Sequence, residues 1–384
     1  MSHDPIRFIS GLSSRLAARS RHVCMLLGAG ASRACGLPDL LQLQDLVLDS
    51  LSSAHEKYFR TQLEGRNLEG ALSRLRRIRA LLSGESEIEG LTAAKAFELD
   101  RAVCAAIVDQ LSLKNANLDP VENLARWMRR SNYLRPIELF TVNYDLLIET
   151  ALDRNRVLYF DGFSGNLEAR FQTSLVEGDF ITNAERIPGY FARFWKLHGS
   201  VNWIVKKDGT ICRVGYSASG DDVAAIYPSD LKYDESRRVP FVVLQDRFRR
   251  ALLQPETLLL VAGYSFSDDH LDELIFDAIA TRQRSEVIVF CFGGLPEKLK
   301  QRAQEHPNFQ IVTQCEAIIA GRLGPWKAAD NSPSAYWDGA ELALPDFAKL
   351  THYLSRAEGP AALPLDGLEA LPTVHANDAP GPAP

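Results

Sequence analysis

Cysteine is scarce in this sequence, and its spacing excludes a dense disulfide framework. The chain has 6 cysteines in 384 residues, and no two of them form a Cys-x-x-Cys pair. Two of them, Cys24 and Cys291, stand inside apolar runs, where cysteine behaves as a small hydrophobic residue. We therefore expect reduced thiols and a cytoplasmic protein.

Long apolar runs are absent as well. No stretch reaches the ~18 consecutive apolar residues that a membrane-spanning helix needs. No long apolar run precedes Val23, so the sequence predicts neither a signal peptide nor contact with a membrane.

The chain also lacks an excess of positive charge. Its 43 lysines and arginines are outnumbered by 49 acidic residues, which gives a net charge of −6. This balance argues against a broad nucleic-acid surface, and we expect no direct binding of nucleic acid. The two basic clusters, at 74–79 and 247–250, have helical spacing, which is typical of a solvated helix face.

What the sequence does contain is a buried strand that runs into a glycine turn, Val23-Cys-Met-Leu-Leu-Gly-Ala-Gly-Ala-Ser32. Gly28 permits a tight turn, Gly30 permits close approach of a pyrophosphate, and a helix then directs its free N–H groups at the anion. The third glycine of the dinucleotide fingerprint is missing, because Arg33 stands in its place. No acidic residue ends a second strand about 20 residues further on. A glycine turn without a ligand is the alternative.

Apolar strands alternate with helical patterns through most of the chain. The predicted strands are 23–27, 136–142, 157–160, one ending at 194–200, 257–262, 286–292 and 309–313, the last closing the sheet. The predicted helices are 4–21, 144–152, 241–253 and 269–281. A β-hairpin is predicted across 201–214 and an irregular segment over 215–240. Such alternation predicts an α/β fold with a doubly wound parallel sheet.

Helical spacing without strands fills the stretch after the first strand. We therefore predict a core domain of residues 1–39 and 131–325, into which a helical module of residues 40–130 is inserted. Residues 326–355 form a C-terminal segment that could contact another chain, and residues 356–384 form an Ala- and Pro-rich tail that we expect to be disordered.

Polar groups follow four of the predicted strands. They are Gly28 to Ser32, Asn143-Tyr-Asp145, His198-Gly199 and Gly263-Tyr-Ser265. In a parallel sheet these four strand ends meet at one edge, where ligands bind in open α/β folds. For single residues a structural role is the alternative: Asn143 could cap the following helix, His198 could be a buried structural histidine, and Ser265 could be an ordinary turn hydroxyl.

The four segments, together with Gly36-Leu-Pro-Asp39, resemble the sirtuin superfamily in their order and spacing across residues 23–295. The run Gly263-Tyr-Ser-Phe-Ser-Asp268-Asp and the Asn-Tyr-Asp triplet resemble a bacterial sirtuin-like branch. That resemblance implies a Rossmann-like fold. Sirtuin deacylases carry two Cys-x-x-Cys pairs for zinc between the His-Gly and Gly-x-Ser segments. This chain has only Cys212 there, so we expect no zinc and no metal site.

The resemblance implies that NAD+ is a substrate, cleaved between nicotinamide and ribose through an oxocarbenium-like state. It implies catalytic roles for Asn143, which would hold the ribose hydroxyls and the attacking water, and for His198 as general base. Other residues would bind NAD+: the pyrophosphate by Gly28, Ala29, Gly30 and Ser32, the nicotinamide side by Asp39 and Asp145, and the adenine-ribose side by Gly263 and Ser265.

The resemblance further implies a bacterial antiphage effector, an NAD+ glycohydrolase (NADase) that releases nicotinamide and ADP-ribose and is restrained by a partner or by assembly. About 60 residues follow the sheet, which we take as too few for a sensor domain. We expect a homo-oligomer and a HerA-type hexameric ATPase as partner. The alternatives are a non-catalytic module that binds NAD+ or ADP-ribose, a protein deacylase or ADP-ribosyltransferase, and a dehydrogenase.

Overall fold

The structure is a computed structural model of the 384-residue chain. It describes residues 2–83, 86–166, 168–178, 191–206, 208–216, 224–226, 239–328 and 335–356. The tail predicted for 356–384 lies outside the described residues, apart from Arg356.

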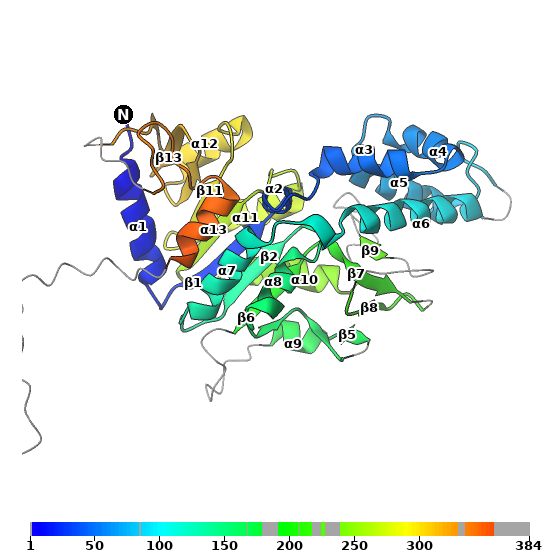
Figure 1. The fold of residues 1–384 in the computed structure, drawn as a ribbon, viewed down its shortest axis with the longest axis horizontal. Helices are drawn as coiled ribbons and strands as arrows, with labels where there is room; N and C mark the ends of the chain where they lie inside the picture. The colour runs from blue at the N-terminus through cyan, green and yellow to red at the C-terminus, as the bar shows by residue number, and fades with distance from the viewer. Residues whose placement is uncertain are drawn as a thin grey trace, which may run out of the picture.

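A nine-stranded, mostly parallel sheet forms the centre of the molecule (Figure 1). Its strands, in spatial order, are β14 (Arg322–Pro325), β13 (Glu316–Ile319), β12 (Phe309–Val312), β11 (Glu286–Phe290), β10 (Thr257–Ala262), β1 (His22–Leu27), β2 (Ile137–Thr141), β6 (Ala192–Lys196) and β3 (Tyr159–Phe160). The central strands are almost continuously apolar because both of their faces are covered. The predicted α/β class with a Rossmann-like parallel sheet is confirmed.

The prediction that 309–313 closes the sheet was wrong. β12 is followed by β13 and β14, which pair antiparallel at that edge. They are joined by Ala320 and Gly321, with φ of 51° and 75°. Positive φ at both central residues is typical of a type I′ hairpin turn. Asn-Gly is a strong sequence signal for this turn, whereas Ala-Gly is not. The hairpin was therefore not predicted from the sequence.

Helices cover both faces of the sheet. On one face, alternate β1 residues such as Met25 pack with α1 (Pro5–Ala17), α7 (Asp119–Arg130), α8 (Leu147–Arg154) and α13 (Phe347–Ser355). On the other face, Cys24 and Leu26 pack with α10 (Phe241–Leu252), α11 (Asp269–Thr281) and α12 (Glu297–Glu305). Successive strand residues point to opposite faces, which divides the core into these two layers.

The segment between β1 and β2 is helical, and its helices lie in two different places. After α2 (Ala29–Ala34) come α3 (Leu40–Ser50), α4 (Ser53–Leu63), α5 (Leu68–Leu81), α6 (Ala93–Gln110) and the 3₁₀ turn η1 (Leu113–Asn115). Figure 1 shows α3 to α6 as a group at one end of the molecule. In contrast, α7 packs on α8 and α13, over the sheet.

A second, five-stranded sheet lies beside the carboxyl end of β6. Its strands, in spatial order, are β4 (Phe163–Ser164), β5 (Ala169–Phe171), β8 (Ile211–Arg213), β7 (Gly199–Val205) and β9 (Ala224–Ile226), with α9 (Thr173–Glu177) after β5. The predicted hairpin is confirmed as β7 and β8, which pair antiparallel. The segment predicted to be irregular, 215–240, contains β9, and much of it lies outside the described residues.

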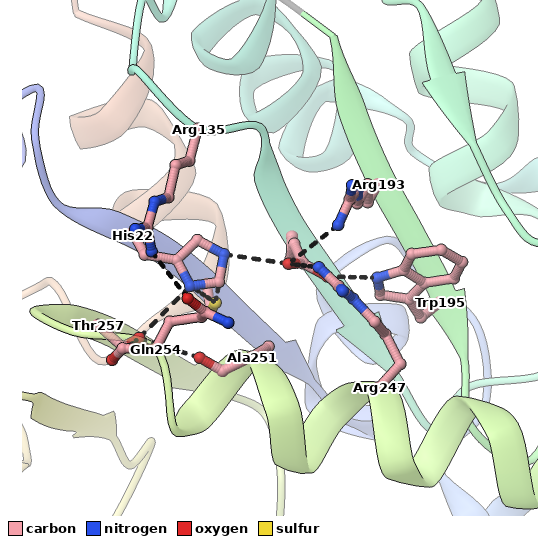
Figure 2. Close-up of polar contacts among 10 residues, drawn as sticks. His22, Arg135, Arg193, Trp195, Arg247, Ala251, Gln254 and Thr257 are labelled. Atoms are coloured by element: carbon pink, nitrogen blue, oxygen red, sulfur yellow. Dashed lines mark hydrogen bonds and ion pairs between the residues drawn. The ribbon is translucent and has the colours of Figure 1, made fainter. Parts of the chain in front are cut away.

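A buried charge cluster ties α10 to the sheet at the end remote from the glycine turn (Figure 2). The Glu138 carboxylate accepts hydrogen bonds from Trp195 Nε1 at 2.8 Å and from two nitrogens of Arg247, of which Nε lies at 2.8 Å. His22 Nε2 lies 3.1 Å and Arg193 Nη1 3.8 Å from Glu138 Oε1. All five side chains are buried, so one carboxylate joins β1, β2, β6 and α10.

The C-terminal segment is part of the core. Phe347, Leu350, Tyr353 and Leu354 of α13 are buried, and the helix packs on α7 and α2. An assembly contact by residues 326–355 stays a prediction. Among the described residues, no helix combines the length and the apolar character needed to cross a membrane.

Candidate functional site

The four strands with polar ends are neighbours in the sheet and run parallel. Register pairs Leu27 of β1 with Thr141 of β2 and with Ala262 of β10, and it pairs Thr141 with Lys196 of β6. The segments that follow these strands therefore start at one edge of the sheet. Asn143 and His198 each come two residues after a register pair, on strands that lie about 4.8 Å apart.

A directed chain of hydrogen bonds fixes the Asn143 side chain. Asn143 Nδ2 donates to the carbonyl of Gly28 at 2.9 Å and to Ser32 Oγ at 2.8 Å. Ser32 Oγ in turn donates to Asp145 Oδ2 at 2.5 Å, and Asp145 Oδ1 accepts from the Leu147 N–H. Since a carbonyl only accepts, the amide nitrogen must face Gly28. The amide oxygen, Oδ1, is left free to accept a hydrogen bond, with no donor among the described residues.

The alternative role for Asn143, capping the following helix, is wrong. The N-cap position of α8 is Leu146, without a side-chain cap, and the Asn143 amide points toward β1 instead. The first turn of α8 is served by Asp145, which accepts from Leu147 N at 3.0 Å.

A pocket lies beside this chain of hydrogen bonds. Its polar lining consists of Ser32, Thr141, Asn143 and Asp145, and its other lining residues are apolar, among them Phe194. The pocket is small, with room for about one water molecule. His198, Gly263 and Ser265 are not among its lining residues.

The glycines of the first turn pack against the Gly263 backbone. A Cβ at Gly28 would lie 2.5 Å from the carbonyl oxygen of Gly263, and one at Gly30 would lie 2.6 Å from the Gly263 Cα. Gly263 itself has a φ of 65°. The close approach that the structure shows at Gly30 is thus between the first turn of α2 and the loop after β10, and binding of a pyrophosphate there stays a prediction.

This packing predicts that Gly28→Ala destabilises the protein. The added methyl group must push backbone atoms apart, and such overpacking costs about 1–3 kcal/mol. Urea unfolding measures the loss. Gly294→Ala is the matched control, because a Cβ there meets nothing within 4 Å. Equal stability of the two variants would contradict the packing argument.

Lys196 supports the loop that carries Asn143. Its buried ammonium group donates to the carbonyl oxygens of Tyr144 and Asp145 and to Glu149 Oε1 at 2.9 Å. Burial raises the pKa of the Glu149 carboxyl, a shift that the Lys196 charge opposes. These contacts explain why a lysine stands before Leu197-His198-Gly199.

Tyr144 links the same loop to the inserted helices. Its hydroxyl donates to Glu69 Oε1 of α5 at 2.6 Å, and the side chain is buried. Burial and the Glu69 carboxylate both raise the pKa of Tyr144. The tyrosine between Asn143 and Asp145 therefore carries a direct contact from the helical insertion to the loop of the site.

His198 is buried and faces the start of α11. Its Nε2 lies 3.0 Å from Asp268 Oδ2. The Asp268 side chain also caps α11 by accepting from the N–H groups of His270 and Leu271. From the sequence alone, Asp268 was assigned no role in the site. The contact with His198 could have been suspected, because Asp268 is a carboxylate that follows a strand at the same edge of the sheet.

The remaining predicted site residues lie around the edge of the sheet. Asp39 caps α3 with Oδ1 and pairs with Arg33 at 3.1 Å through Oδ2. Ser265 Oγ is 2.9 Å from Ser267 Oγ on an exposed turn, and Ala29 is exposed at the start of α2. None of the three lines the pocket, and their roles in binding stay predictions. Within the described ranges, no group of three or more His, Cys, Asp or Glu side chains could hold a metal ion.

The chain was compared with known protein families and with curated proteins. No curated protein matches the chain. A family model described as SIR2-like domain matches residues 137–312, the part that holds β2, β6, β10, β11 and β12. Such domains are typically NAD-utilising enzymes. Over these residues the chain is similar to SIR2-like domains, in keeping with its Rossmann-like α/β fold.

Proposed function

We propose that this chain is an NAD+ glycohydrolase, which releases nicotinamide and ADP-ribose. The observation that carries the proposal is the fixed amide of Asn143. Its nitrogen is held by Gly28 and Ser32, and its oxygen accepts no hydrogen bond from the described residues. A preoriented acceptor of this kind binds a hydroxyl group or a water molecule without reorganising.

In this proposal Asn143 Oδ1 accepts a hydrogen bond from the attacking water or from a ribose hydroxyl. The bond between C1′ and the nicotinamide nitrogen breaks, and its electron pair goes to the nitrogen, so nicotinamide leaves neutral from a cation. The water oxygen bonds to C1′ of the oxocarbenium-like state. Lys196 holds the loop in place throughout, through the Tyr144 and Asp145 carbonyls.

His198 is the general base of the proposed reaction. It takes the proton that the water loses, a role that suits an imidazole near neutral pH. It follows β6, next to the strand that Asn143 follows. Asp145 and Asp39 would serve the nicotinamide side. Gly28, Ala29, Gly30 and Ser32 would hold the pyrophosphate, and Gly263 and Ser265 would serve the adenine-ribose side.

We further propose that the reaction serves antiphage defence and is restrained by assembly. Uncontrolled hydrolysis of NAD+ would harm the cell that makes the enzyme, so a partner or an oligomer must hold it inactive. A HerA-type hexameric ATPase is the partner we propose. The Tyr144–Glu69 contact supports such control, because it joins the helical insertion to the loop that carries Asn143.

Nicotinamide release from NAD+ tests the proposal. The purified chain is incubated with NAD+, alone and with the ATPase, and products are separated by chromatography. We expect nicotinamide and ADP-ribose in equal amounts, release slowed by about 10²- to 10⁴-fold in His198→Ala, and normal release in the control His306→Ala. Binding of NAD+ without turnover in both states would support the non-catalytic module instead. Release that requires an acylated peptide would support a deacylase.

A further inference from the structure

Asp268 makes contacts in two directions, and each of its oxygens serves one of them. Oδ1 accepts from the backbone N–H groups of His270 at 3.0 Å and Leu271 at 3.3 Å, which caps α11. Oδ2 is 3.0 Å from His198 Nε2. The cap therefore orients the carboxylate so that its other oxygen faces the imidazole. Rotation away from this orientation would break the hydrogen bonds that cap α11.

The Asp268 carboxyl is held in its charged form. Burial by itself would raise its pKa, but the hydrogen bond and charge of His198 and the two N–H groups of the cap outweigh burial, so the pKa is lowered. A charged carboxylate only accepts hydrogen bonds. His198 Nε2 must therefore carry a proton and donate it to Asp268.

This arrangement determines the tautomer of His198. With the proton on Nε2, the neutral imidazole keeps its lone pair on Nδ1. In the described part of the chain, Nδ1 has no hydrogen-bond partner. We propose that Asp268 is a positioning residue that holds His198 in the Nε2–H tautomer, so that Nδ1 is the atom that accepts the proton from water. This rests on the proposed hydrolysis of NAD+.

The water O–H bond breaks as the oxygen bonds to C1′, and the proton moves to Nδ1 and gives an imidazolium ion. Asp268 keeps its negative charge and stabilises that ion across the Nε2–H bond. An orienting carboxylate behind a histidine base is a recurring device in hydrolytic sites on unrelated folds.

Asp268→Asn separates this role from the helix cap. Asparagine caps helices about as well as aspartate, so its oxygen would remain with His270 and Leu271. Its NH₂ group would then face His198 Nε2, and it can only donate. Nε2 must give up its proton in order to accept, which moves the proton to Nδ1 and removes the base. The fold is expected to survive this variant.

The kinetic test is a double-mutant cycle. We expect Asp268→Asn to lower kcat about 10- to 100-fold, part of the contribution of a general base, with KM nearly unchanged. In a His198→Ala background the same substitution should have no further effect, because it acts through His198. The control Glu273→Gln removes an exposed carboxylate from the same helix and should match wild type. Equal losses in both backgrounds would overturn the proposal.

The tautomer itself is measured by ¹⁵N NMR on histidine-labelled protein, which needs no turnover. Wild type should show His198 protonated at Nε2 above the pH at which the ring becomes neutral, and Asp268→Asn should show it protonated at Nδ1. An Nδ1–H tautomer in wild type, or no change in the variant, would overturn the proposal. If the tautomers behave as expected but NAD+ is not hydrolysed, the proposed reaction fails and the positioning contact stands.

Discussion

Asn143→Ala is expected to lower the rate of nicotinamide release by about 10²- to 10³-fold, as when one preorganised polar group is removed from an active site. The variant loses the amide oxygen that would hold the water or the ribose, and no neighbouring group replaces it. The Gly28 carbonyl and Ser32 Oγ each lose one hydrogen bond, the one donated by Asn143 Nδ2. Nicotinamide release under single-turnover conditions measures the effect.

Two further variants sharpen this test. Asn155→Ala is the matched control, because that side chain only bonds the Ala151 carbonyl at the end of α8, and it should keep wild-type activity. Ser32→Ala keeps the Asn143 amide but breaks the chain to Asp145, so it should fall between the two. Wild-type release from Asn143→Ala would remove the basis of the proposed hydrolysis.

Glu138→Gln is expected to give the largest loss of stability. It removes the carboxylate that faces Arg193 and Arg247 in the core, and breaking a buried ion pair from one side costs about 3–5 kcal/mol. Urea unfolding at pH 7 measures the loss. Glu286→Gln is the matched control, since Glu286 also pairs with two arginines but at a partly exposed site, where such pairs contribute at most about 1 kcal/mol each. Equal losses in the two variants would contradict this prediction.

The same cluster gives stability a pH dependence. Burial would raise the pKa of Glu138, but the hydrogen bond from His22 and the charge of Arg247 lower it well below its usual range. A carboxyl with a lowered pKa in the folded state stabilises fully above its ordinary pKa of about 4.3, and this contribution is lost as the pH falls further. Unfolding free energies between pH 7 and pH 3 should therefore decrease more steeply for wild type than for Glu138→Gln. Parallel curves for the two proteins would show that Glu138 does not cause the pH dependence of stability.

Local patterns predicted the elements that bury a continuous apolar run. β1, β2, β10 and β11 were readable because strands covered on both faces leave few positions for polar residues. Their parallel arrangement was enough to predict that Gly28, Asn143, His198 and Gly263 would follow strands at one edge. The prediction failed at the other end of the sheet, where β13 and β14 are short and turn on Ala320-Gly321.

Residue types and their spacing along the chain were enough to establish the α/β class, the strand-end motifs and the lack of the cysteine pairs that a sirtuin zinc site needs. The directions of the functional side chains, in contrast, could be read only from the three-dimensional arrangement. The Asn143 amide is fixed by Ser32, which lies 111 residues away in the sequence. The His198 ring is fixed by Asp268, which lies 70 residues away. A hydrogen bond between such distant positions depends on how the strands are ordered in the sheet, and spacing along the chain does not encode it.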